Sequence, residues 1–307
     1  MKIVQFTIPV EIDNSIHLQE DRLPYFYEHL HRHTETQITW VISGEGTLIA
    51  GNTMQRFQSG DLFVIGANQP HLFKSDPLYF DETNRKSIHS LNIFFNPTGF
   101  ISQLLAFPEM RGIKKFVTSS GFGMQASEKD AAKLSEHFLK IKNSSAGFRL
   151  AYFIELLQVM ANLKKWKYLS TESFEFTITD SEGLRMNDIY QYTMEHFTKN
   201  ITLEQIAAIV YLTPQSFCRY FKKHTSKTYI IFLNEVRINE ACKRMMEMNF
   251  DSISTIAYQS GFNNVVTFNR VFKSITGKAP REYIKEYHKR NSISSGYYLK
   301  KCPIDCN

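Results

Sequence analysis

The first half of the chain alternates between short apolar segments and polar turns. The segment 37–43 is β-branched and aromatic, and it stops at Gly44-Glu45-Gly46. Similar segments cover 47–50, 54–58, 61–65, 71–74 and 88–95. Many short strands at this spacing are typical of a β-sandwich or β-barrel. Such a closed sheet can hold one small ligand.

Around Pro97 the apolar positions change to a helical period. Ser127 and the acidic residues after it predict a helix start. A second helix is expected from Ala146 to Lys167, and Lys164-Lys165-Trp166-Lys167 is expected to form its solvated last turn. Its wide apolar face fits either packing against the barrel or pairing with a second copy. Residues 168–183 are rich in Ser, Thr and Glu and predict a linker.

The second half is helical and contains a repeat. Thr202-Leu203-Glu204-Gln205 is a capping box, and Thr213-Pro214 marks the next helix start. Two helices joined by a short turn have the form of a helix-turn-helix. The pattern returns further along the chain: Phe217, Arg219, Phe221 and Lys222 match Phe268, Arg270, Phe272 and Lys273 at an offset of 51. Two copies in register are much stronger evidence than one.

Charge separates the same two halves. The chain has 307 residues and a net charge of +6. Residues 1–184 carry 18 basic and 20 acidic side chains, a net of −2, and residues 185–307 carry 18 and 10, a net of +8. A basic helical segment indicates a polyanionic partner such as nucleic acid.

Composition excludes several classes of protein. Hydrophobic residues make up 43% of the chain, which argues against wholesale disorder. No apolar run approaches the roughly 18–20 residues of a membrane span, and residues 1–14 lack the apolar stretch of a signal peptide. Four cysteines form no disulfide scaffold: Cys218 and Cys242 fall in predicted helices, and Cys302 and Cys306 have no His nearby to complete a zinc site. We expect a cytoplasmic protein without metal or cofactor and without a membrane partner.

Residues 185–290 resemble the DNA-binding domain of the AraC/XylS transcription regulators. The most specific residues are Gly261-Phe262, Phe268-x-Arg270-x-Phe272-Lys273 and Thr276-Gly277-Lys278-Ala279-Pro280-x-x-Tyr283. The resemblance implies a helix from Tyr229 to Met248 between the two units, a homodimer and contact with RNA polymerase. It also implies an activator more often than a repressor, and an effector such as a sugar. Ser226 and Tyr229 depart from the Gly and Pro of the family pattern; a serine there carries a cost if its φ is positive.

His31-Arg32-His33 and His71 resemble the two motifs of the cupin superfamily. In metal cupins, such histidines and a following glutamate bind one divalent ion. Gln37 stands at the glutamate position, and a neutral amide is a poor ligand for such a cation, although Glu35 is close by. A metal site, hydrogen-bonded barrel residues and direct contact with an organic effector all remain open. The candidate effector-binding residues are His31, His33, Gln37, Trp40 and His71.

The repeat also predicts how DNA would be read. Recognition helices fit the major groove, where Gln215 could read adenine and Arg219 guanine. Val265 and Val266 would favour thymine methyl groups, and the lysines would contact phosphate. The alternative for Arg219 and Arg270 is a salt bridge. The candidate DNA-binding residues are Thr213, Pro214, Gln215, Cys218, Arg219, Lys222, Lys223, Asn264, Val265, Val266, Thr267, Arg270 and Lys273.

We therefore predict a two-domain α+β protein. A cupin-like β-barrel with accessory helices covers 1–167 and would bind an effector and dimerise. A linker covers 168–183, an all-α double-stranded-DNA-binding domain with two helix-turn-helix units covers 184–290, and a tail covers 291–307. The leading hypothesis is a ligand-responsive transcription regulator that is not an enzyme. The alternatives are a metal-dependent cupin enzyme fused to a DNA-binding domain, and a constitutive architectural DNA binder.

Overall fold

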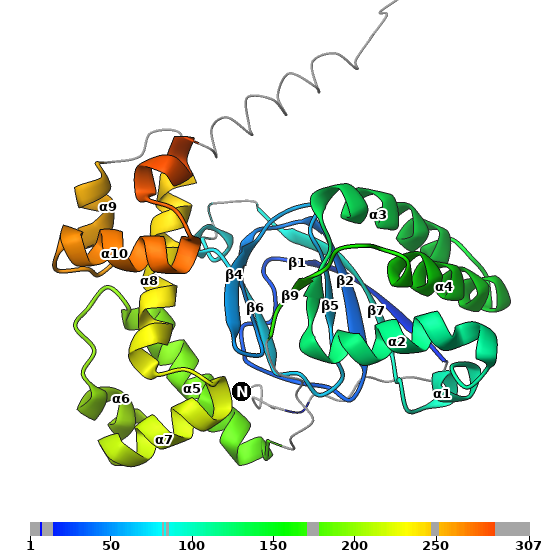
Figure 1. The fold of residues 1–307 in the computed structure, drawn as a ribbon, viewed down its shortest axis with the longest axis horizontal. Coiled ribbons are helices and arrows are strands. Elements are labelled where there is room, and N and C mark those ends of the chain that lie inside the picture. Colours follow the sequence, from blue (N-terminus) through cyan, green and yellow to red (C-terminus); the bar gives the residue numbers. More distant parts are fainter. Residues whose placement is uncertain are drawn as a thin grey trace, which may run out of the picture. The chain divides into compact units, whose positions relative to one another are not determined.

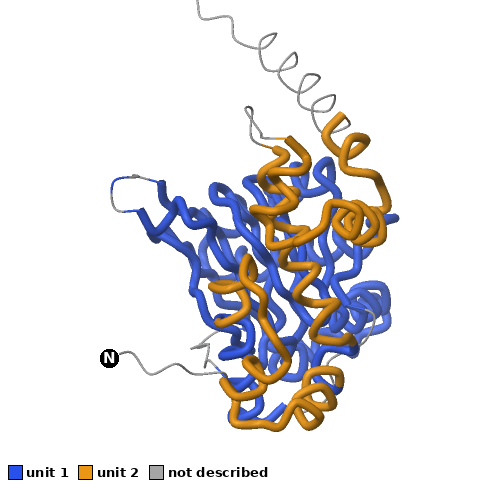
Figure 2. Tube along the Cα trace, turned by 90° about the vertical axis from the view of Figure 1, so that its left-hand side faces the viewer, with its two compact units in different colours: residues 1–191, 223–226 blue, residues 192–222, 227–307 orange. Residues whose placement is uncertain are grey.

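The computed structural model describes Thr7, Thr83 and residues 15–81, 86–170, 178–246 and 252–285. Two compact units account for the chain, one of residues 1–191 with 223–226, the other of 192–222 with 227–307 (Figure 2). The predicted tail 291–307, with Cys302 and Cys306, lies outside the described residues, as does part of the predicted linker.

The first unit contains two antiparallel sheets (Figure 1). The larger has the order β1-β7-β2-β5-β8-β9 and the smaller has the order β4-β3-β6. The strands of the larger sheet are β1 (His17–Leu23), β2 (Thr36–Ser43), β5 (Leu62–Ile65), β7 (Ile88–Phe95), β8 (Met124–Gln125) and β9 (Lys167–Tyr168). Those of the smaller are β3 (Gly46–Ala50), β4 (Thr53–Phe57) and β6 (His71–Ser75). The segments predicted as strands between residues 37 and 95 are all strands. The strand β1 was not predicted from the sequence.

Apolar side chains on the two faces of the larger sheet belong to two separate hydrophobic cores. On β2, Ile38 and Trp40 belong to a core with the helices, whereas Val41 packs with Phe63 and Phe73 in a second core. The helices of this unit are α1 (Phe100–Leu104), α2 (Arg111–Ser119), α3 (Glu128–Lys142) and α4 (Ala146–Ala161), and α2 to α4 cover one face of the larger sheet (Figure 1). The opposite face turns toward the smaller sheet, and the cavity described below opens on this side.

The predicted end of the second accessory helix was wrong. The helix α4 ends at Ala161, and Lys167 belongs to the short strand β9. The indole of Trp166 donates to the carbonyl of Met160 at 3.3 Å, and the backbone N–H of Leu163 donates to the same carbonyl at 3.2 Å. The wide apolar face of α4 is buried within the unit through Phe153, Leu156, Leu157 and Met160. This favours packing over the sheet, and pairing with a second copy stays a prediction.

The remaining helices carry the repeat. They are α5 (Asp180–His196), which begins inside the predicted linker, then α6 (Leu203–Ile209), α7 (Pro214–Thr225), α8 (Tyr229–Met246), α9 (Ile253–Gln259) and α10 (Val265–Thr276). The capping box at Thr202 and Gln205 is present with both of its hydrogen bonds. No helix among the described residues is long and apolar enough to cross a membrane. The predicted two-domain α+β architecture is confirmed, and the exact domain boundaries stay a prediction.

Positive φ occurs at matching points of the two repeats. Tyr211 has φ 56° where Gly261 has φ 87°, between the two helices of each unit. Ser226 has φ 56° where Gly277 has φ 77°, after the second helix. The departure at Ser226 therefore does place a serine in a left-handed conformation, which glycine tolerates at lower cost. Tyr229, the other departure, is buried, and its ring packs against Phe217 and Phe221.

Candidate ligand cavity and DNA-binding helices

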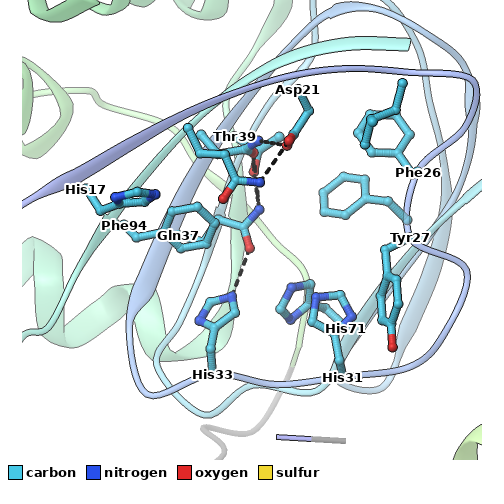
Figure 3. Close-up of a pocket in the computed structure, with 14 residues that line it drawn as sticks. His17, Asp21, Phe26, Tyr27, His31, His33, Gln37, Thr39, His71 and Phe94 are labelled. Atoms are coloured by element: carbon cyan, nitrogen blue, oxygen red, sulfur yellow. Dashed lines mark hydrogen bonds between the residues drawn. The ribbon is translucent and has the colours of Figure 1, made fainter. Parts of the chain in front are cut away.

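A cavity of about 390 Å³ lies inside the first unit (Figure 3). Polar residues at alternate positions of β1 contribute one wall, and the segment before β2 contributes another. The lining residues are His17, Gln19, Asp21, Leu23, Phe26, Tyr27, His31, His33, Gln37, Thr39, His71, Phe73, Asn92 and Phe94. Four of the five predicted effector residues are therefore brought together around one cavity.

The three histidines form one cluster. The ring centroid of His71 lies 4.2 Å from that of His31 and 5.0 Å from that of His33. His31 and His71 come together because their backbones form an isolated antiparallel bridge, with hydrogen bonds of 3.1 and 2.8 Å. Burial lowers the pKa of His31 to about 4 and lowers those of His33 and His71 as well. All three rings are neutral near pH 7.

Each histidine ring is oriented by a backbone carbonyl. The Nδ1 atoms of His31, His33 and His71 lie 2.9, 2.8 and 2.9 Å from the carbonyls of His29, Glu35 and Gln69. The other nitrogen of His33, Nε2, lies 2.9 Å from Oε1 of Gln37. Both atoms that face the ring are acceptor oxygens, so a neutral His33 donates to one of them only.

A chain of buried polar side chains continues from Gln37 across the sheet (Figure 3). Gln37 donates to Thr39 Oγ1 at 2.8 Å, and Thr39 donates to Asn92 Oδ1 at 2.8 Å. Asn92 then donates to Asp21 Oδ2 at 2.7 Å. These bonds satisfy polar groups that would otherwise be costly to bury, and they fix the cavity wall.

The structure removes one residue, Trp40, from the candidate set. Trp40 lies on the other face of β2 from Gln37 and Thr39, and its ring packs near Phe138 at 6.0 Å, outside the cavity. The period of two along a strand explains this, since positions 37 and 40 point in opposite directions. Glu35 is buried, accepts a hydrogen bond from Thr34 and is absent from the lining. Within the described residues, no cluster of three or more His, Cys, Asp or Glu side chains has the geometry to hold a metal ion.

The helix α7 has a buried side and an exposed side. Phe217 and Phe221 are fully buried, whereas the sequence-predicted contacts on the other side are exposed: Gln215, Cys218, Arg219, Lys222 and Lys223. Thr213 accepts from the backbone N–H of Ser216 at 3.3 Å and so caps the helix. Pro214 is half-buried at the first helical position. Among the predicted contacts on α7, Lys223 forms an ion pair, with Glu182 at 3.3 Å.

The helix α10 repeats this arrangement with a difference. Phe268 and Phe272 are fully buried, and Thr267, Arg270 and Lys273 are exposed. The side chain of Asn264 accepts from the backbone N–H groups of Val266 and Thr267 and is therefore the helix cap. Val265 packs against the core of the unit, whereas the neighbouring Val266 is 77% exposed. Of the two valines predicted to meet thymine, Val266 is the more exposed, and contact of either with DNA stays a prediction.

Arg237 holds the second helix-turn-helix in place. Its Nε donates to the carbonyl of Phe197 at 2.8 Å and its Nη2 to that of Lys199 at 2.9 Å. The guanidinium also lies over the ring of Phe262, 5.8 Å from the centroid. Gly261 makes this approach feasible, because a Cβ there would lie 2.5 Å from the carbonyl oxygen of Phe197. The position requires glycine for space as well as for its positive φ.

The fold and these sites define a protein with a cupin-type cavity and paired helix-turn-helix units. A family model described as a helix-turn-helix domain matches residues 206–286, and one described as a cupin domain matches residues 24–77. The resemblance found in the sequence is thereby confirmed at the level of its two domains: a cupin match lies in the first half of the chain and a helix-turn-helix match in the second.

Relatives of the chain are described as HTH-type transcriptional regulators. The chain is 28% identical over 123 residues to YdeC of Bacillus subtilis, an HTH-type transcriptional regulator, a match covering 39% of this chain and 42% of YdeC. It is 23% identical over 297 residues to the HTH-type transcriptional regulator SAS0078 of Staphylococcus aureus, covering 88% of this chain and 34% of the relative. The chain thus spans less than half the length of these relatives.

Solved structures with similarity include ToxT from Vibrio cholerae, at 20% identity and a TM-score of 0.34, covering 88% of this chain and 97% of ToxT. Another is the DNA-binding domain of AdpA in complex with a target DNA, at 25% identity and a TM-score of 0.31. That match covers 33% of this chain and 91% of the AdpA domain.

Proposed function

We propose that the chain is a transcription regulator that binds double-stranded DNA sequence-specifically and responds to a small molecule held in the cupin cavity. One observation carries the DNA-binding part. The helices α7 and α10 bury equivalent phenylalanine pairs and expose equivalent arginines, Arg219 and Arg270, within the part of the chain that carries +8.

The exposed side chains suit the two kinds of DNA contact. An arginine fork can bond both acceptors of a guanine edge in the major groove, and Gln215 can do the same for adenine. Lys222 and Lys273 follow at equivalent positions and would neutralise phosphates. The caps at Thr213 and Asn264 leave the N-terminal ends of both helices ordered. Val266 would add an apolar contact in the second half of the site.

The test measures binding of the full chain to a DNA duplex selected by it, as a function of salt. We expect the affinity to fall steeply, with a slope that corresponds to about five to eight phosphates. Arg219→Ala and Arg270→Ala should each cost about 1–3 kcal/mol at one base position. Arg111→Ala, on the exposed side of α2, is the matched control and should leave binding unchanged. A flat salt response would remove the proposed phosphate contacts. Equal losses on all duplexes would remove the proposed base-reading role of the two arginines.

The remaining parts of the proposal concern partners. We propose a homodimer that activates transcription through RNA polymerase, and an effector in the cavity that shifts the equilibrium between conformations of different DNA affinity. The relatives' names as transcriptional regulators support a regulator rather than an enzyme. The sugar suggested by the family resemblance remains a prediction.

One observation favours a second candidate, a metal-dependent cupin. The Nδ1 atoms of His31 and His71 each face a backbone carbonyl, which orients the rings as in a histidine ligand of a metal. Metal analysis of the purified chain separates the two. Stoichiometric iron, manganese or zinc that disappears in His71→Ala would favour the enzyme, and its absence in both proteins would favour the regulator.

A further inference from the structure

The wall of the cavity accepts hydrogen bonds and carries negative charge. Among its lining residues, Asp21 is the one carboxylate, and neither lysine nor arginine is present. A ligand therefore meets the carboxylate of Asp21 and four imidazoles, of which those of His31, His33 and His71 are neutral near pH 7. This inference rests on the proposed effector cavity and concerns the chemical class of its ligand.

Two of the imidazoles face the cavity as acceptors. Carbonyl oxygens only accept, so the contacts of His31 and His71 with the carbonyls of His29 and Gln69 keep the hydrogen on Nδ1. In a neutral ring, Nε2 then has a free lone pair. The Nε2 atom of His71 is buried and has no partner among the described residues. An unmatched buried acceptor is costly, and a ligand N–H or O–H group would satisfy it.

Asp21 lies at the opposite end of the cavity from His71 (Figure 3). Its carboxylate accepts from Gln19 Nε2 at 2.8 Å and from Asn92 Nδ2 at 2.7 Å, and both donors are neutral amides. Within the described part of the chain, no lysine or arginine forms an ion pair with it. A half-buried carboxylate with only amide partners attracts a cation more strongly than an exposed one, because less water screens it.

Aromatic rings complete the wall. Phe26, Tyr27, Phe73 and Phe94 also line the cavity. Such rings cover the apolar body of a ligand and attract a nearby cation through their faces. A carboxylate-bearing ligand would instead place its negative charge among Asp21 and the imidazole lone pairs.

We propose that the cavity binds a small organic amine in its cationic form. The ammonium group pairs with Asp21, the apolar body packs on the aromatic rings, and a second donor at the far end bonds Nε2 of His71. The same geometry disfavours organic acids.

Three probes of one shape test the charge directly: tyramine, tyrosol and 4-hydroxyphenylacetate carry an ammonium, a hydroxyl and a carboxylate on the same phenol. Binding to the full chain, freed of metal by a chelator, is measured by calorimetry and by the shift in melting temperature. We expect tyramine to bind at least about ten-fold more tightly than tyrosol, and 4-hydroxyphenylacetate to bind most weakly. Asp21→Asn should bring tyramine to the level of tyrosol.

Glu20→Gln is the matched control. Glu20 precedes Asp21 on β1 but pairs with Lys142 at 2.6 Å and with His89 at 2.8 Å, and it does not line the cavity. It should leave the preference for tyramine unchanged.

Several results would overturn the proposal. They are equal binding of tyramine and tyrosol, a preference for the carboxylate, no binding of tyramine, or an unchanged preference in Asp21→Asn. Tight zinc binding that His71→Ala abolishes, together with no amine binding, would assign the cavity to a metal instead. DNA binding is measured on the same samples. DNA binding without amine binding would contradict the proposed ligand class alone. Amine binding without DNA binding would contradict the proposed DNA-binding function alone, so the two proposals are tested separately.

Discussion

Tyr211→Gly should stabilise the helix-turn-helix unit that contains it. Tyr211 has φ 56° and is 95% exposed, so its side chain contributes little packing while its backbone pays for a left-handed conformation. That conformation costs an L-residue about 1–2 kcal/mol, and glycine recovers most of it despite its larger entropy in the unfolded chain. We expect a gain of about 1 kcal/mol, or about 4 °C in melting temperature for a domain of this size.

Two glycines of the second repeat calibrate this value. Nothing lies within 4 Å of a Cβ built on Gly277, so Gly277→Ala introduces no clash. The left-handed conformation at φ 77° is then the only source of strain, and the substitution should cost about 1 kcal/mol. A Cβ on Gly261 would lie 2.5 Å from the carbonyl oxygen of Phe197, so Gly261→Ala should cost about 2 kcal/mol or more.

The assay is urea unfolding followed by two signals. Both tryptophans, Trp40 and Trp166, belong to the first unit, whereas helical circular dichroism reports both units. The Tyr211→Gly gain should therefore appear in the dichroism transition and not in tryptophan fluorescence. A neutral or destabilising Tyr211→Gly, together with the expected loss in Gly277→Ala, would refute the reasoning from backbone strain.

Three further predictions concern base reading, pH and the arginine support. Uracil lacks the methyl group of thymine, so replacing thymine by uracil at the base that meets Val266 should weaken binding by about 0.8 kcal/mol. Val266→Ala should abolish that difference. A selected DNA site whose binding is insensitive to uracil at every position contradicts the prediction. Because burial lowers the pKa of His31 from 6.5 to about 4, the unfolded chain binds more protons in between, and stability should fall as pH drops from 6.5 toward 4. The midpoint of denaturant unfolding, measured between pH 6.5 and 4, should fall less steeply with decreasing pH in His31→Gln than in the unmodified chain. Arg237→Met should cost about 2–3 kcal/mol by thermal unfolding, since the carbonyls of Phe197 and Lys199 lose their donors, whereas Arg244→Met in the same helix should cost under about 1 kcal/mol.

Much of the fold could be predicted because local signals agree with the tertiary structure. The capping box at Thr202 and the buried phenylalanine pairs mark the helices of the repeat in the sequence itself. The strand β1 carries no such signal, because polar residues stand on both of its sides: His17, Gln19 and Asp21 line the cavity, and Glu20 and Arg22 alternate with them. The end of α4 could not be predicted either, since neither a glycine nor a proline follows Ala161 in residues 162–170.

The sites could be predicted only in part for a related reason. The histidines stand in recognisable spacing, but Asp21 and Asn92 join them through strand pairing that has no local trace in sequence. Trp40 looked suitable by residue type, and only strand direction places it outside. The sequence does not show that the side chain of Asn264 caps α10 or that Val265 packs partly against the core, and their contact with DNA stays a prediction.

The central claim is that two equivalent helices read DNA. Selection of bound sequences from a random duplex pool by the full chain tests it most directly. The account predicts a two-part site whose halves lie about one helical turn apart. Arg219→Ala should relax the preference in one half and Arg270→Ala in the other. Recovery of no preferred sequence, or of a site that both substitutions blur in the same half, would contradict it.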